Sequence, residues 1–255
     1  MKIGAQTYTI REHLKNEAEI ESSLRKLKSM GFNMVQLSGL GPCDFDRLDG
    51  WIKELELEIC GTHSPWDRIT DPAELKKLIN EHKRLGCNDI GIGIIPEKFP
   101  YTYDGLTDFI KQVNTVSKII KDNGLTFSYH NHELEFQKFN GQKVIDRLIE
   151  ECPHMNFIYD VFWAQAGGLN PSEYIDKLKG RISIIHFKDF RVQGRNRQFA
   201  EIGQGNLDWA DIIPRSEKNG IPWAVIEQDA DFMVDCFDSL AVSRKFLIDN
   251  GYWKK

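Results

Sequence analysis

The chain alternates between short apolar runs and longer amphipathic segments eight times from end to end. The runs are bounded by Gly, Asn or Pro, which is typical of parallel strands buried on both faces. Strands are predicted over residues 3–8, 34–38, 58–62, 89–94, 125–129, 155–160, 182–187 and 224–228. Helices are predicted over 17–30, 45–55, 72–85, 106–123, 143–151, 171–178, 208–219 and 232–248.

Start and stop signals support these helices. Asp71-Pro72 and Asn170-Pro171 each combine an N-cap residue with a proline at the first helical position. A glycine follows the last residue of four of the segments, as at Leu85-Gly86 and Asn219-Gly220, which is typical of a helix C-terminus.

Eight strand–helix units in 255 residues match the size of one (β/α)8 barrel. An open doubly wound sheet is the structural alternative, and it normally carries a glycine-rich phosphate loop after its first strand. Here the first strand ends in Gln6-Thr7-Tyr8-Thr9-Ile10, without such a loop. The sequence therefore predicts an α/β protein with a (β/α)8 TIM barrel in a single domain spanning residues 1–255.

Four acid or imidazole groups lie at or just beyond the ends of the last four predicted strands. They are Glu135, Asp160, His186 and Glu227. A barrel gathers the carboxyl ends of its strands at one rim, where the chemistry of this architecture is found. Burying so many charges without compensation would be costly. A bound divalent cation such as Mn²⁺, Co²⁺, Zn²⁺ or Mg²⁺ offsets the negative charge, so the set predicts a metal site.

Other polar and aromatic residues share the same predicted rim. Each one, taken singly, is more often a turn residue, a structural histidine or rim packing than a functional group. Their convergence favours a substrate site. The set is Gln6, Gln36, Ser38, His63, Trp66, His130, His132, Trp163, Lys188 and Arg191.

Charge and composition narrow the function classes. A net charge of −5 provides no general field for nucleic acid. No stretch approaches the roughly 20 apolar residues of a membrane span, and the N-terminus has no signal-peptide pattern. The five cysteines are scattered and odd in number, which indicates reduced packing residues. We expect a cytoplasmic protein without nucleic-acid or membrane partners.

Five segments together resemble a known family. They are Tyr129-His-Asn-His-Glu-Leu-Glu-Phe136, Tyr159-Asp-Val-Phe-Trp163, Gly180-Arg-Ile-Ser-Ile-Ile-His-Phe-Lys-Asp-Phe190, Gly203-Gln-Gly-Asn-Leu-Asp208 and Val225-Ile-Glu-Gln-Asp229. The chain is similar, nearly end to end, to the sugar phosphate isomerase/epimerase group of the xylose isomerase-like TIM barrels, close to inosose dehydratases. These motifs are specific for the superfamily and not for one substrate.

The resemblance implies one divalent metal ion, Mn²⁺ first with Co²⁺, Zn²⁺ or Mg²⁺ as alternatives, held by Glu135, Asp160, His186 and Glu227. The strand-five ligand stays open. Many relatives carry a ligand glutamate directly on that strand, where this chain has His130. Either Glu135 is the ligand, or His130 or His132 takes that role with Glu135 supporting it.

The resemblance also implies proton abstraction next to a metal-chelated carbonyl of a keto-sugar or related polyol, through an enediolate. Glu135 and Glu227 would serve its two faces, with His132 as an alternative base. If a β-hydroxyl is expelled from the enediolate instead, the site is that of a dehydratase, and Lys188 would stabilise the intermediate or donate the proton. The substrate-binding residues would be Gln6, His63, Trp66, His130, Trp163 and Arg191.

Alternative functions follow from the same barrel. A lyase or dehydratase acting on an inosose or a 3-keto-glycoside is favoured by the segments 203–208 and 225–229. An endonuclease IV-like repair enzyme would need several metals and a basic face, and the net charge of −5 disfavours it. A non-catalytic sugar-binding barrel is disfavoured by the complete ligand set.

The expected partner is a small-molecule carbohydrate. Arg191, Arg195 and Arg197 either meet an anionic group or form a solvated basic loop. A homo-oligomer stays open, because Tyr252-Trp253 can dock on the barrel or on a second subunit.

Overall fold

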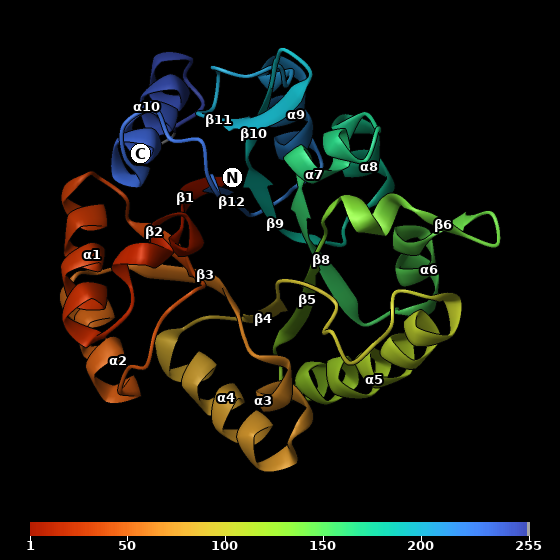
Figure 1. Cartoon of the computed structure of the whole chain (residues 1–255). Helices are drawn as coiled ribbons and strands as arrows, with labels where there is room; N and C mark the ends of the chain where they lie inside the picture. The colour runs from red at the N-terminus through yellow and green to blue at the C-terminus, as the bar shows by residue number, and fades with distance from the viewer. Residues whose placement is uncertain (254–255) are drawn as a thin grey trace.

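Eight parallel strands close into a barrel in the computed structural model, which describes residues 1–253 (Figure 1). The order around the barrel is β1-β12-β9-β8-β5-β4-β3-β2, and β1 closes it by pairing with both β12 and β2. The predicted TIM barrel is confirmed. The barrel strands are β1 (Lys2–Gln6), β2 (Met34–Leu37), β3 (Glu58–His63), β4 (Asp89–Ile92), β5 (Thr126–His130), β8 (Met155–Asp160), β9 (Ile182–Phe187) and β12 (Trp223–Ile226).

Helices surround the barrel, and each of the eight predicted ones is present. The helices are α1 (Glu17–Ser29), α2 (Phe45–Glu54), α3 (Trp66–Thr70), α4 (Pro72–Leu85), α5 (Tyr103–Asp122), α6 (Val144–Glu151), α7 (Val161–Ala166), α8 (Pro171–Lys177), α9 (Trp209–Lys218) and α10 (Cys236–Asp249), with 3-10 helices η1 (Thr7–His13) and η2 (Glu133–Phe136). The short α3, α7, η1 and η2 were not predicted, because one or two turns carry too little periodicity.

Side-chain caps set the helix boundaries. Asp71 caps α4 by accepting hydrogen bonds from the backbone N–H groups of Ala73 and Glu74. Helix α10 begins four residues later than predicted, because Asp235 accepts from the N–H of Asp238 and so marks the first turn.

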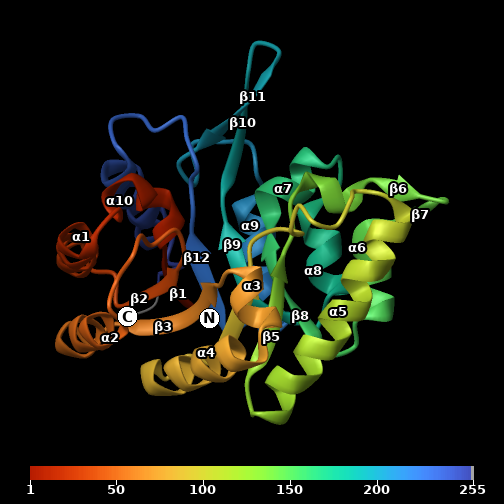
Figure 2. The same ribbon diagram turned by 60° about the horizontal axis from the view of Figure 1, so that its bottom comes forward.

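Two small antiparallel hairpins decorate the barrel. They are β6 (Lys138–Phe139) with β7 (Gln142–Lys143), and β10 (Asp189–Gln193) with β11 (Asn196–Ala200). Neither was predicted. Figure 2 shows the β10–β11 hairpin standing beyond the carboxyl ends of the barrel strands. Because β10 follows β9 almost directly, the hairpin rises beside the rim where the predicted site residues gather.

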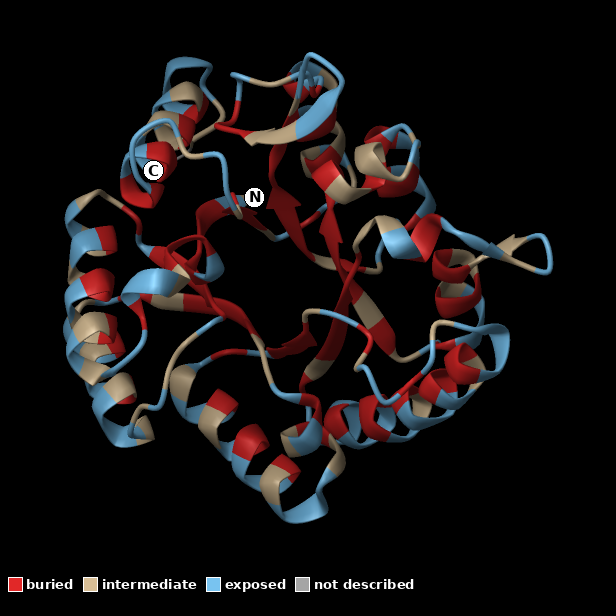
Figure 3. Ribbon diagram, in the orientation of Figure 1, coloured by how far each residue is buried: buried red, intermediate tan, exposed pale blue. Residues whose placement is uncertain are grey.

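The buried hydrophobic residues form two clusters. Figure 3 shows burial concentrated on the barrel strands and on the sides of the helices that face them. The larger cluster contains residues of both the strands and the helices. The smaller one consists of Met34, Cys60, Ile158, Ile184 and Val225. Side chains alternate along a strand, so Asp160, His186 and Glu227, two residues beyond Ile158, Ile184 and Val225, share their side of the sheet.

The C-terminal aromatic residues dock on the barrel. The Trp253 ring lies 5.6 Å from the Phe32 ring, and the Arg244 guanidinium stands 4.7 Å over Trp253. Tyr252 also packs against the large core. Of the two predicted alternatives, docking of Tyr252-Trp253 on the barrel is therefore confirmed.

The cysteines are free, and Cys60, Cys87, Cys152 and Cys236 are buried, as expected for packing residues. Within residues 1–253, none of the helices combines the length and the apolar character needed to cross a bilayer.

Candidate active site

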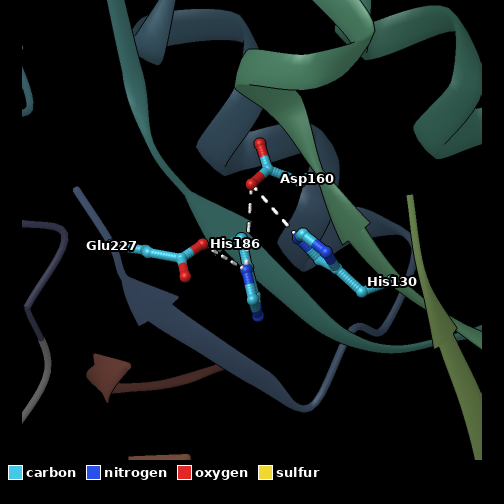
Figure 4. A group of neighbouring side chains, drawn as sticks. All are labelled: His130, Asp160, His186 and Glu227. Atoms are coloured by element: carbon cyan, nitrogen blue, oxygen red, sulfur yellow. Dashed lines mark hydrogen bonds and ion pairs between the residues drawn. The ribbon is translucent and has the colours of Figure 1, made fainter. Parts of the chain in front are cut away.

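Four buried side chains meet at the carboxyl ends of four barrel strands. They are His130 at the end of β5, Asp160 at the end of β8, His186 on β9 and Glu227 directly after β12. One nitrogen or oxygen atom from each lies within 4.8 Å of the others (Figure 4). This size and donor set fit a single cation.

The Asp160 carboxylate is oriented by the helix that follows it. Its Oδ1 accepts hydrogen bonds from the backbone N–H groups of Phe162 and Trp163, at 2.8 and 3.2 Å, and so caps α7. The other oxygen, Oδ2, faces the histidines and lies 3.3 Å from Nε2 of His130 and 3.8 Å from Nδ1 of His186.

In each histidine, the ring nitrogen that points away from the centre of the cluster (the outer nitrogen) contacts an oxygen acceptor, which fixes the orientation of the ring. Nδ1 of His130 donates to the backbone carbonyl of Gly93 at 3.2 Å. Nε2 of His186 lies 2.6 Å from Oε1 of Gln36, and because an amide oxygen accepts, this pairing matches the tautomer with its proton on Nε2. The inner nitrogens then carry lone pairs. Nδ1 of His186 lies 2.8 Å from Oε2 of Glu227, and Nε2 of His130 faces Asp160.

Lone pairs thus face carboxylate oxygens at the centre of the cluster, and only a shared cation or proton makes that arrangement favourable. Burial lowers the pKa of His130 well below its ordinary value, so its imidazole stays neutral. Metal-binding histidines commonly have their second nitrogen fixed by an oxygen acceptor in this way. Two imidazoles and two carboxylates suit Zn²⁺, Co²⁺ or Mn²⁺ better than Mg²⁺, which prefers oxygen ligands.

Lys188 supplies a positive charge to the same cluster. Its Nζ lies 3.3 Å from Oδ2 of Asp160, 3.0 Å from Oε2 of Glu227 and 2.9 Å from Oδ2 of Asp229. Burial opposes this charge, but the three carboxylates outweigh burial and raise the pKa of Lys188 above its ordinary value. The rings of Trp163 and Phe199 cover the ammonium at 5.1 and 5.6 Å.

A cavity of about 310 Å³ opens onto the cluster. Three buried polar atoms near it have no hydrogen-bond partner in the described chain: Nε2 of His63, Nδ1 of His132 and Oδ1 of Asp229. Buried polar atoms are normally paired, so these three mark where a polar ligand would bind. The cavity is lined by Tyr8, Ser38, His63, Gly93, Ile94, His130, His132, Lys188, Glu227 and Asp229.

Two further histidines are neutral in this cavity. Burial lowers the pKa of His132 to about 3 and that of His63 well below its ordinary value. The His63 and His132 rings lie 5.3 and 4.7 Å from the His130 ring. Nδ1 of His63 also lies 3.2 Å from Oγ of Ser38. The lone pairs of these neutral imidazoles can accept hydrogen bonds from a ligand.

Glu135 lies in a separate hydrogen-bonded group. Its carboxylate is fully buried and accepts from the hydroxyls of Tyr101 and Tyr129, at 2.7 and 2.6 Å, and from the backbone N–H of His132. Glu135 sits on η2 beyond β5, whereas His130 is on the strand itself. The structure therefore places His130, and not Glu135, among the four convergent groups, and it places Glu135 where it anchors the loop that carries His132.

The other predicted substrate-binding residues are Trp163, which lies near the cluster, and Gln6, Trp66 and Arg191, whose contacts lie elsewhere. Trp163 is near the cluster, with its ring 5.2 Å from that of His132. Gln6 is buried at the end of β1 and accepts from the N–H of Tyr8. Trp66 packs in an aromatic group with Phe99, Phe109 and Phe127, and Arg191 pairs with Gln198 in the β10–β11 hairpin.

Sequence reasoning missed Asp229 and Tyr8 as site residues. The signal for Asp229 is its place in Glu227-Gln228-Asp229, two residues after a strand-end glutamate. Tyr8 is the last residue of the first predicted strand, but β1 ends at Gln6 and Tyr8 lies in η1, which was not predicted.

A larger cavity of about 580 Å³ adjoins the first and shares Ser38 and His63 with it. Apolar side chains from β2, α2 and α4 and the loop after β2 line much of it, including Leu40, Phe45 and Leu78.

Comparison with protein families matches residues 24–231 to the family described as Xylose isomerase-like TIM barrel. A comparison with curated proteins gave no match.

Solved structures share the whole fold. A sugar phosphate isomerase/epimerase from Parabacteroides distasonis superposes with a TM-score of 0.80 at 24% identity, covering 99% of each chain. The probable 3-DHS dehydratase AsbF from Bacillus anthracis gives 0.71 at 15% identity, covering 97% of this chain and 99% of that one. The IOLI protein with a binding zinc atom gives 0.71 at 14% identity, covering 100% of both chains.

Proposed function

This chain belongs to the family of xylose isomerase-like TIM barrels, and on that basis we propose that it is a divalent-metal-dependent isomerase or epimerase of a keto-sugar or related polyol. The observation that carries the proposal is the pair of histidines, His130 and His186, whose outer nitrogens are held by oxygen acceptors while their inner nitrogens face carboxylates. The structural similarity to the sugar phosphate isomerase/epimerase and to the IOLI protein with a binding zinc atom supports the proposal.

His130, Asp160, His186 and Glu227 would hold the ion, with Zn²⁺, Co²⁺ or Mn²⁺ favoured by the two imidazoles. A divalent ion at this site supplies Lewis-acid polarisation of a substrate carbonyl, which acidifies the adjacent C–H bond. All four residues are buried, and His130 and Glu227 also line the cavity, so a bound ion would be shielded from bulk water.

The protein's own groups would bind the substrate and move the proton. Glu227 and His132 both line the cavity, and we assign them removal of the proton next to the carbonyl and its return. Lys188 would offset negative charge that develops on the substrate oxygen. The unpaired Nε2 of His63 and Oδ1 of Asp229 would bind substrate hydroxyls, which suits a polyhydroxylated ligand.

The test combines metal content with proton exchange. We expect about one Zn, Co or Mn per chain by elemental analysis, lost in Asp160→Ala and Glu227→Ala. With a panel of keto-sugars in D₂O, NMR should detect exchange of the proton next to the carbonyl in the metal-loaded wild type only. A wild type that binds no metal after reconstitution would refute the proposal.

A lyase is the second candidate, and the 580 Å³ cavity beside His63 favours it. A monosaccharide does not need this extra space, whereas a glycoside carrying an apolar aglycone would use it. Incubation with a 3-keto-glycoside separates the two candidates: a lyase releases the aglycone, whereas an epimerase or isomerase returns a product of unchanged mass.

A further inference from the structure

Lys188 and the proposed metal ion would use the same two oxygen atoms. We propose that the Lys188 ammonium competes with the divalent ion for Oδ2 of Asp160 and Oε2 of Glu227 and so sets the metal affinity. In the same proposal, Asp229 retains the ammonium when the ion is bound. This inference rests on the metal site of the proposed function.

The shared oxygens are fixed by their surroundings. Oδ1 of Asp160 is engaged by the N–H groups of Phe162 and Trp163, so Oδ2 is the atom left for a cation. That atom lies 3.3 Å from Nζ of Lys188. Oε2 of Glu227 lies 3.0 Å from the same Nζ and 2.8 Å from Nδ1 of His186. The ammonium therefore forms ion pairs with the carboxylate oxygens that face the histidines.

The ion and the Lys188 ammonium oppose each other's binding because both are positively charged. Asp160 and Glu227 carry two negative charges, which one divalent ion neutralises. Adding the Lys188 ammonium places like charges on the same two oxygens, in a buried site where water screens them little. The ion and the ammonium each lower the affinity of the cluster for the other.

Asp229 offers the ammonium a second position. Its Oδ2 lies 2.9 Å from Nζ of Lys188, and Asp229 is not one of the four convergent metal-binding groups. Its Oδ1 is buried and without a partner in the described chain, and Asp229 lines the cavity. An ammonium that leaves Asp160 and Glu227 can keep this ion pair under the rings of Trp163 and Phe199. It then faces the substrate and not the metal ligands.

The test is the equilibrium affinity for Zn²⁺ and Mn²⁺, measured by competition with a chromophoric chelator. Lys188→Met removes the charge and keeps an unbranched side chain one atom shorter, and it should bind metal about tenfold or more tightly than the wild type. Lys188→Gln is a second neutral variant, and Lys188→Arg is the control that keeps the charge and should gain no affinity. Equal or weaker binding by both neutral variants would overturn the proposal.

Asp229→Asn should have the opposite effect, because the ammonium loses its second position and stays on the metal ligands. In the Lys188→Met background, the effect of Asp229→Asn should shrink, since no ammonium is left to retain. An effect of equal size in both backgrounds would overturn the role assigned to Asp229.

Stability gives a readout independent of activity. Without metal, Lys188→Met leaves Asp160 and Glu227 buried without their counter-ion, so its melting temperature should fall below that of the wild type. Added Zn²⁺ should then raise the melting temperature of Lys188→Met by more than it raises that of the wild type. If the wild type binds no metal, the proposed function fails. If it binds one ion but the neutral variants bind it no more tightly, only this inference fails.

Discussion

Nε2 of His186 lies 2.6 Å from Oε1 of Gln36, a residue 150 positions earlier in the chain. The two side chains come from β9 and β2, which are not neighbours in the barrel, so this hydrogen bond crosses its interior. With Oε1 of Gln36 as the acceptor, the proton of His186 is on Nε2 and the Nδ1 lone pair faces Glu227.

Replacing Gln36 by leucine should therefore weaken metal binding with the four proposed ligands intact. We expect a loss of about 10- to 100-fold in affinity, as is usual when such a supporting acceptor is removed. Chelator competition measures the change. Gln36→Glu, which keeps an acceptor oxygen, serves as the control, and a Gln36→Leu protein with wild-type affinity would contradict the assigned role.

The choice of ligand from the fifth strand can be tested directly. His130→Ala should lose the bound metal, because His130 is one of the four convergent groups. Glu135→Gln should keep about one ion per chain, because the Glu135 carboxylate is occupied by Tyr101, Tyr129 and the backbone of His132. Elemental analysis of both variants decides the matter. Metal loss in Glu135→Gln with retention in His130→Ala would restore Glu135 as the ligand.

The absence of a side chain at Gly91 allows Thr62 and Ile158 to pack closely against it inside the barrel. A Cβ atom at this position would lie 2.5 Å from the backbone oxygen of Thr62 and 2.6 Å from Cδ1 of Ile158. Gly91→Ala should therefore lower the free energy of unfolding by about 1–3 kcal/mol, as overpacking does. Urea denaturation measures the loss. Gly50→Ala, where a Cβ meets nothing within 4 Å, is the matched control and should not be destabilised.

Asp89 should make stability depend on pH. Burial raises the pKa of Asp89 to about 6, although Ser183 and Ser128 hydrogen-bond to its carboxylate. The folded protein therefore holds this proton more tightly than the unfolded chain, whose aspartates titrate near ~3.9. As pH rises from about 4 to about 6, the free energy of unfolding should fall by roughly 3 kcal/mol from this group.

Asp89→Asn should remove this dependence of the free energy of unfolding on pH. The variant should therefore be more stable than the wild type above about pH 6 and similar to it near about pH 4. Urea denaturation at several pH values provides the comparison. Asp108→Asn is the control, because the Asp108 side chain is 64% exposed. A wild type and an Asp89→Asn variant with parallel pH profiles would refute the expectation.

The sequence predicted the barrel because its signals are local. Each strand is a short apolar run and each helix carries its own periodicity and caps, as Asp71 and Gly86 do for α4. The same logic brought Asp160, His186 and Glu227 to one rim, since each ends a strand. It did not reveal Asp229 or Tyr8, whose positions depend on how the chain turns after the strand.

What the sequence determined by itself is the alternation of eight strands and helices, and with it the rim where the chemical groups gather. Only the tertiary structure decided which groups meet. Tyr129 and His130 are adjacent in the chain, yet Tyr129 bonds to Glu135 and His130 faces Asp160. The physical reason is that neighbouring side chains of a strand point to opposite faces of the sheet, whereas the partners across the barrel, such as Gln36 for His186, come from distant strands that only barrel closure brings together.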